Sequence, residues 1–167
     1  LPINRKQKVF PNGTLVIENV ERMSDQATYT CVAKNSQGYS VRGNLELQVM
    51  VSPLISPFEF DEAVFYGESI QVMCHIPKGD MPLNLTWSFR GQHLSKNAAV
   101  KITTLGDRSS ILAIPAATEK HSGNYTCTAS NIVASTNHTA VLNVQVPPRW
   151  ILEPTDKAFA QGSDAKV

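Results

Sequence analysis

Three cysteines, Cys31, Cys74 and Cys127, carry the most distinctive chemistry of this sequence. Cysteines can form a disulfide or hold a metal ion. A metal site needs further Cys or His residues at ligand spacing, and neither Cys74 nor Cys127 has them. These two residues therefore predict a structural disulfide, which indicates an oxidising, extracellular environment.

Catalytic chemistry is not expected. The histidines, His75, His93, His121 and His138, have no paired nucleophile and no His-Glu-x-x-His spacing. The chain also lacks a glycine-rich phosphate loop and a carboxylate cluster, so we expect no enzyme activity, cofactor or small-molecule substrate. A net charge of +1 offers no basic field for nucleic acid. Function is therefore expected to lie in protein–protein contact.

The elements that must position the cysteines have the pattern of an immunoglobulin domain. Trp87 follows Cys74 by 13 residues, and Tyr125 precedes Cys127 by two. A disulfide between two sheets, a Trp packed on it and a tyrosine corner two residues before the second Cys are typical of that fold. Apolar residues alternate around each anchor, as half-buried strands require. Cys74, Cys127, Trp87, Tyr125 and, in an earlier repeat, Tyr29 are the expected core anchors.

The predicted fold class is all-β, with tandem intermediate-set immunoglobulin-like sandwiches: one complete domain flanked by two partial ones. The complete domain covers residues 51–146. Its strands A to G are expected at 53–60, 69–76, 83–89, 99–104, 109–114, 123–130 and 137–146. Only 11 residues separate Phe89 from Lys101, too few for the full C′ and C″ strands of a variable domain.

Residues 1–50 repeat the second half of the central domain, because 25–31 matches 121–127. They are predicted to be strands D to G of another immunoglobulin domain. Cys31 would then be its second cysteine, paired to a residue outside this sequence; a free reactive thiol is the alternative. Residues 147–167 resemble the start of the central domain and predict a further copy. The neighbouring domains of the same chain are thus expected partners, joined by short, proline-stiffened junctions.

N-glycosylation sequons occur at four positions, Asn12, Asn84, Asn124 and Asn137. Together with the disulfide they predict a secreted or cell-surface protein. No apolar run approaches the roughly 20 residues needed to span a bilayer. We expect an ectodomain segment of a membrane protein, with its anchor outside this sequence.

The two faces of the central domain differ. The outward positions of strands C, F and G are small and polar and carry all the sequons of this domain. The outward positions of strands B, D and E carry none, and they are Gln71, Met73, His75, Lys101, Thr103, Ser109, Ile111 and Ala113. Single exposed apolar residues are ordinary, but the glycan asymmetry independently favours an interface on this bare face.

Three segments resemble the Down syndrome cell adhesion molecule (Dscam) family. They are Gln7-Lys-Val-Phe-Pro-Asn-Gly-Thr-Leu15, Ser24-Asp-Gln-Ala-Thr-Tyr-Thr-Cys-Val-Ala-Lys-Asn35 and Pro147-Pro-Arg-Trp-Ile-Leu-Glu-Pro154. The similarity is best to the arthropod hypervariable members, from the sixth into the eighth immunoglobulin domain. It implies isoform-specific homophilic adhesion in neuronal self-avoidance, alternative splicing of the central domain, and a role in arthropod immunity.

The resemblance also implies self-pairing of the seventh domain through its A-B-E-D sheet, which is the bare face. We therefore predict antiparallel, two-fold pairing of two copies through this face. Met73, Ile111 and Ala113 would supply apolar burial and the polar residues would read identity. Two alternatives stay open: a heterophilic receptor or immune-recognition module, and a structural spacer.

Overall fold

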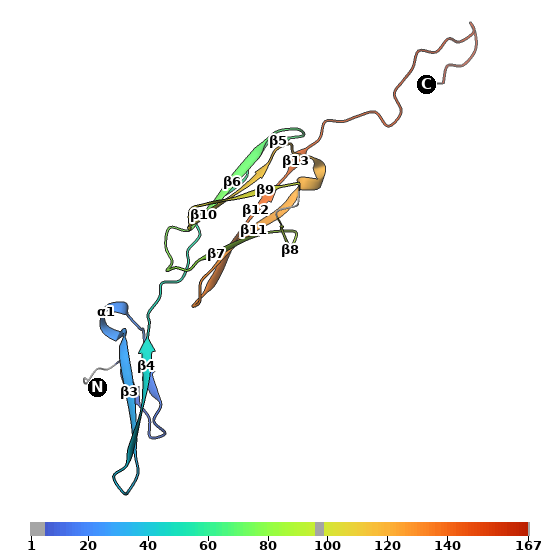
Figure 1. The fold of residues 1–167 in the computed structure, drawn as a ribbon. Coiled ribbons are helices and arrows are strands. Elements are labelled where there is room, and N and C mark those ends of the chain that lie inside the picture. Colours follow the sequence, from blue (N-terminus) through green and yellow to red (C-terminus); the bar gives the residue numbers. More distant parts are fainter. Residues whose placement is uncertain (1–5, 96–98, 167) are drawn as a thin grey trace.

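The computed structural model describes residues 6–95 and 99–166, and it is an elongated, almost entirely β chain (Figure 1). Two hairpins come first, a β-sandwich occupies the middle, and an extended segment follows. The helical elements are single turns, α1 (Arg22–Asp25) and the 3-10 helix η1 (Glu119–His121). Each lies directly before a long strand that carries a tyrosine corner.

The first unit consists of two antiparallel hairpins. β1 (Gln7–Val9) pairs with β2 (Leu15–Ile17), and β3 (Ala27–Lys34) pairs with β4 (Ser40–Leu47). Asp25 is fully buried, and its carboxylate accepts a hydrogen bond from the Glu21 amide at 2.7 Å. Cys31 is free and exposed, and an open groove between the hairpins is lined by Val9, Leu15, Tyr29, Cys31 and Leu45 among others.

The central unit is a sandwich of two antiparallel sheets. One has the order β6 (Ile70–His75), β10 (Ser109–Ile114), β9 (Lys101–Leu105). The other has the order β12 (Ser135–Leu142), β11 (Gly123–Ser130), β7 (Asn84–Phe89), β8 (Gln92–His93). Apolar side chains alternate along both sheets and meet between them, which is why strands of this period form a sandwich. The fully buried side chains include Cys74, Ile76, Leu112, Ile114, Cys127, Ala129 and Leu142.

The first strand differs from its prediction. Residues 53–60 form no continuous strand; Leu54 makes an isolated bridge to Lys78, and the Ser56 amide donates to the His75 carbonyl at 2.9 Å. The chain then crosses over, and β5 (Val64–Phe65) pairs in parallel with β13 (Val144–Gln145). Pro53 and Pro57 explain the interruption, because neither has an amide hydrogen for a ladder.

Residues 147–166 contain no strand in the described structure. The prediction that they begin a further immunoglobulin domain stays a prediction.

Candidate interaction surface

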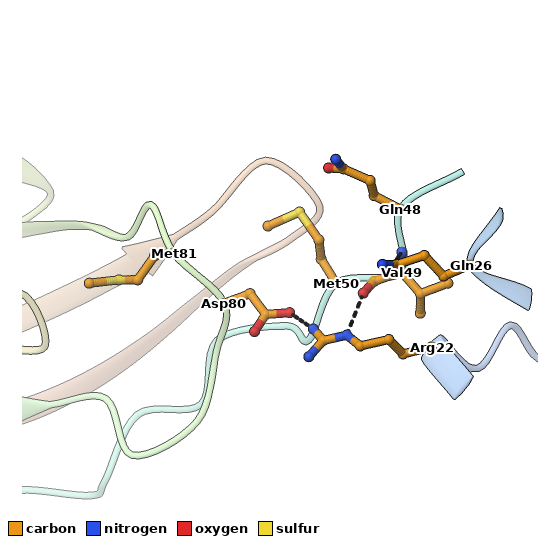
Figure 2. A pocket seen from close by; sticks show the side chains of 7 residues that line it. All are labelled: Arg22, Gln26, Gln48, Val49, Met50, Asp80 and Met81. Carbon is orange, nitrogen blue, oxygen red and sulfur yellow. Dashed lines mark hydrogen bonds and ion pairs between the residues drawn. The ribbon is translucent and has the colours of Figure 1, made fainter. Parts of the chain in front are cut away.

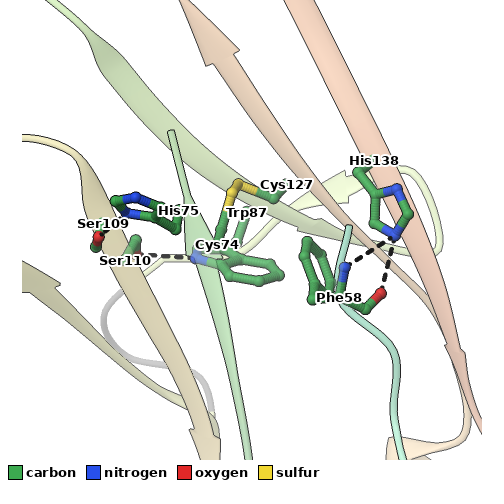
Figure 3. Close-up of a disulfide and its surroundings, with 8 residues drawn as sticks. All are labelled: Phe58, Cys74, His75, Trp87, Ser109, Ser110, Cys127 and His138. Atoms are coloured by element: carbon green, nitrogen blue, oxygen red, sulfur yellow. Dashed lines mark hydrogen bonds between the residues drawn. A yellow bond between two sulfur atoms is a disulfide. The ribbon is translucent and has the colours of Figure 1, made fainter. Parts of the chain in front are cut away.

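The disulfide predicted from the sequence is present and joins the two sheets. Cys74 on β6 and Cys127 on β11 are bonded, with their Cα atoms 6.4 Å apart (Figure 3). Trp87 packs beside the bridge, 5.3 Å from the Phe58 ring, and its indole N–H donates to the Ser110 hydroxyl at 2.9 Å. The tryptophan's one polar group is therefore satisfied across the core, and both sheets are fixed against each other.

A tyrosine corner fixes the start of β11. The Tyr125 hydroxyl donates to the His121 carbonyl at 2.7 Å, and burial raises the pKa of Tyr125 to about 12. Tyr29 makes the same bond to the Asp25 carbonyl at 2.8 Å. The acceptor in both corners is a backbone oxygen, so His121 can stand where the first unit has Asp25.

His121 also closes the turn in front of the corner. Its Nδ1 accepts hydrogen bonds from the Thr118 amide at 2.9 Å and from the Thr118 hydroxyl at 3.1 Å. Burial lowers the pKa of His121, which favours the neutral ring that these bonds require.

The bare face predicted from alternation is formed by the sheet β6-β10-β9. The strand register places its outward side chains in three rows across the sheet. The first row is Gln71, Ala113 and Lys101; the central row is Met73, Ile111 and Thr103; the last row is His75, Ser109 and Leu105. We call this set of rows the BED face.

The BED face combines apolar and polar side chains. Met73 is 46% exposed, Ile111 and Ala113 are partly exposed, and Gln71, Lys101 and Thr103 are exposed. In the central row the apolar Met73 and Ile111 lie side by side, next to Thr103, with the polar groups of the neighbouring rows around them. An exposed arrangement of this kind fits a protein–protein contact.

The structure corrects the prediction that Ser109 is an exposed interface residue. It lies on the outward side of β10 but is only 8% exposed. Its hydroxyl and the His75 Nδ1 are 2.8 Å apart and hydrogen bonded. Ser109 therefore cannot read a partner directly; it orients His75, which is partly exposed.

The sequence prediction also missed Leu105. It is 58% exposed and pairs with Ser109 across the sheet, so it completes the last row. The alternation of β9 would have indicated it, because Leu105 follows Lys101 and Thr103 at the same parity; the predicted strand stopped one residue too early. Leu54, on the irregular first strand, is 52% exposed and bridges Lys78, just beyond the end of β6.

The opposite sheet carries the sequons. Asn84, Asn124 and Asn137 are exposed on β7, β11 and β12. The hydroxyls of Thr126 and Thr139, which belong to the last two sequons, are hydrogen bonded to each other at 2.7 Å. Asn12 lies in the β1–β2 turn, where its side chain accepts a bond from the Thr14 amide at 3.1 Å.

Within residues 6–95 and 99–166, no three His, Cys, Asp or Glu side chains are grouped so that they could hold a metal ion. The same part of the chain has no helix long and apolar enough to cross a bilayer.

Known proteins are similar both to the central unit and to the whole chain. The immunoglobulin domain family model matches residues 53–131. Cell adhesion molecule Dscam1 of Drosophila melanogaster is 57% identical over 169 residues, which is 100% of this chain and 8% of that protein. Human cell adhesion molecule DSCAML1 is 38% identical over 94% of the chain, again 8% of that protein. The chain thus spans about 8% of the length of these curated relatives.

Solved structures agree. The crystal structure of the N-terminal eight immunoglobulin domains of DSCAM isoform 1.30.30 matches with a TM-score of 0.72 and 60% identity, over 99% of this chain and 21% of that one. The Dscam1 Ig7 domain, isoform 5, matches with a TM-score of 0.55 and 32% identity, over 57% of this chain and 98% of that one.

Proposed function

Since the chain belongs to the Dscam family of cell adhesion molecules, we propose that it is an extracellular segment of an adhesion receptor that recognises further copies of itself. The BED face, extended by the adjoining first strand, is the recognition surface. One observation carries this proposal: the sheet without sequons presents the apolar Met73 and Ile111 side by side in its central row, while every sequon of the central unit lies on the other sheet. The adhesion relatives favour a binding role over catalysis.

Two-fold symmetry determines which residues meet. When two sheets pack face to face and antiparallel, the axis lies between them and runs across the strands. Residues in the row on the axis then face their own copies. We place the axis at the central row, Met73, Ile111 and Thr103, because uncharged side chains can face themselves without repulsion.

The outer rows then face each other. Gln71 meets His75 of the second copy, and Lys101 lies off the axis beside Leu105. The lysine stem can pack on that leucine while its ammonium reaches toward Asp107 in the following turn. Like charges are therefore kept apart in a matched pair, whereas a different isoform would bring unmatched groups together.

Affinity of this unit alone should be weak, because one face of a small domain gives a modest interface. Further domains of the receptor would raise the affinity through effective concentration.

We also propose that 1–50 and 147–167 belong to the preceding and following immunoglobulin domains. The open groove of the first unit would be covered by strands of its own domain, including the partner cysteine of Cys31.

Glycans on Asn84, Asn124 and Asn137 are proposed to shield the opposite sheet, and one on Asn12 would extend from the first unit. The receptor would be anchored in the cell membrane, with neuronal self-recognition and immune recognition as its two candidate settings.

Sedimentation of paired variants tests the surface. Ile111→Asp places a charge on the central row, while the inward Leu112 and Ile114 are unchanged. It should abolish dimerisation with little change in melting temperature, whereas Thr126→Asp on the opposite sheet should dimerise like the parent. The reverse pattern would show that the interface lies on the β12-β11-β7-β8 sheet and not on the BED face. A parent that stays monomeric at all accessible concentrations would favour a heterophilic module or a spacer.

A further inference from the structure

The joint between the first unit and the central unit is held by side chains. Residues 48–53 belong to no strand, yet the backbone groups of Val49 and Val51 are hydrogen bonded to both units. Such a segment would otherwise need water for these groups. Figure 2 shows the residues that meet here.

Side chains of the first unit hold Val49. Its amide donates to the Gln26 side-chain oxygen at 3.2 Å, and its carbonyl accepts from the Arg22 Nε at 3.1 Å (Figure 2). The two side chains that hold Val49 belong to α1, in the case of Arg22, and to the residue that follows it, Gln26. The last residues of the first unit are therefore fastened to its own short helix.

The central unit holds Val51 in the same way. The Val51 amide donates to the Asp80 carboxylate at 2.8 Å, and its carbonyl accepts from the Asp80 amide at 3.0 Å. The Asn131 side-chain amide adds a bond to the Val51 carbonyl at 2.9 Å and one to the Asp80 carbonyl at 3.2 Å. Two loops that are far apart in sequence, 76–83 and 131–134, thus both hydrogen bond to the linker residue Val51.

One ion pair joins the two sets. The Arg22 guanidinium donates to the same Asp80 carboxylate oxygen that accepts the Val51 amide (Figure 2). The Arg22 side chain is 50% exposed and that of Asp80 31% exposed. A solvated ion pair contributes little by itself, but these two side chains are already oriented by their backbone bonds, so less conformational entropy is lost when they pair.

We propose that Arg22, Asp80 and Asn131 form a clasp that makes this joint rigid. Asp80 is the central positioning residue, because its carboxylate connects the linker, its own unit and the preceding unit. The clasp sets the angle between the two units. The proposal does not depend on self-association, because all its contacts lie within one chain.

Nuclear magnetic resonance of the ¹⁵N-labelled chain tests the clasp. The sample is kept at a concentration at which sedimentation shows a monomer, so that self-association has no influence. If the joint is rigid, residual dipolar couplings of amides in 27–47, 70–95 and 99–145 fit one alignment tensor. The Val51 amide should also exchange slowly with solvent.

The variants separate the two halves of the clasp. Asp80→Ala should require two alignment tensors and accelerate Val51 exchange by about tenfold or more, because the amide loses a charged acceptor. Arg22→Ala should also require two tensors but leave Val51 protected. Glu62→Ala is the control for Asp80→Ala and Arg42→Ala is the control for Arg22→Ala, because each removes an exposed charge of the matching sign outside the joint; both should behave like the parent.

Either of two results would overturn the proposal. One is a parent chain whose two units already need separate tensors. The other is an Asp80→Ala chain that retains a single tensor while its central-unit amides show the parent fold.

Discussion

Two adjacent serines on β10 provide a sharp test of the sandwich, because they face opposite sides. Ser110 is 3% exposed and accepts the indole N–H of Trp87, itself 2% exposed, at 2.9 Å. Ser109 is on the outer side and bonds to His75, which water can reach. The same substitution at the two positions should therefore have different consequences.

Ser110→Ala removes the acceptor and leaves the indole N–H buried without a partner. An unsatisfied buried donor costs about 1–3 kcal/mol. Ser109→Ala should cost less than about 1 kcal/mol, because water can replace the hydroxyl beside His75. Ser109→Ala should instead weaken dimerisation, since His75 loses the group that orients it.

Urea unfolding followed by tryptophan fluorescence measures the first effect. For a domain of this size, a loss of about 2 kcal/mol lowers the midpoint by on the order of 1 M urea. Sedimentation of the same proteins measures the second effect. Equal midpoints for Ser110→Ala and the parent, or a larger loss in Ser109→Ala, would refute the core assignment.

Three further predictions concern stability. The pKa of His121 is lowered by burial, so the neutral ring contributes its full stabilisation of the fold above the ordinary histidine pKa of about 6.5. This stabilisation is lost as pH falls through the lower pKa of the folded state. The melting temperature should therefore decline over that pH range, and it should decline less in His121→Gln. Gly79→Ala should destabilise more than Gly106→Ala in thermal melts, because a Cβ at Gly79 would lie 2.8 Å from the facing proline backbone at φ +138, whereas nothing lies within 4 Å at Gly106. Replacing Cys74 and Cys127 by Ala should lower the free energy of unfolding by about 4 kcal/mol, because the bridge closes a loop across a sequence separation of 53; denaturation of parent and variant would measure it.

The parts of the fold that depend on local alternation could be predicted from the sequence. The strands β10 (Ser109–Ile114) and β11 (Gly123–Ser130) have the predicted bounds, because apolar residues alternate without interruption and the cysteine fixes which face is inward. The disulfide and the buried Trp87 followed from the same pattern.

The first strand could not be predicted in the same way. Residues 53–60 are rich in apolar side chains, but prolines remove ladder donors and the chain changes sheets, which depends on bonds to β6 and β12. His138 on β12 illustrates this, because its Nε2 lies 2.8 Å from the Phe58 carbonyl (Figure 3). No pattern of period two signals that contact.

The BED face shows where alternation stops being sufficient. Parity placed Ser109 on the correct side of β10 but could not show that His75 covers it. The joint could not be predicted from the sequence, since Arg22 belongs to α1 while Asp80 and Asn131 lie in two separate loops, and the three meet only through the tertiary fold.

Self-crosslinking tests the central claim, homophilic pairing through the BED face, most directly. Thr103 is exposed on the proposed axis row, so a cysteine there should meet its own copy. In a Cys31→Ser background, which removes the free thiol, oxidised Thr103→Cys should give a covalent dimer, whereas Thr126→Cys should remain monomeric. A covalent dimer from Thr126→Cys, with only monomer from Thr103→Cys, would contradict the proposed pairing.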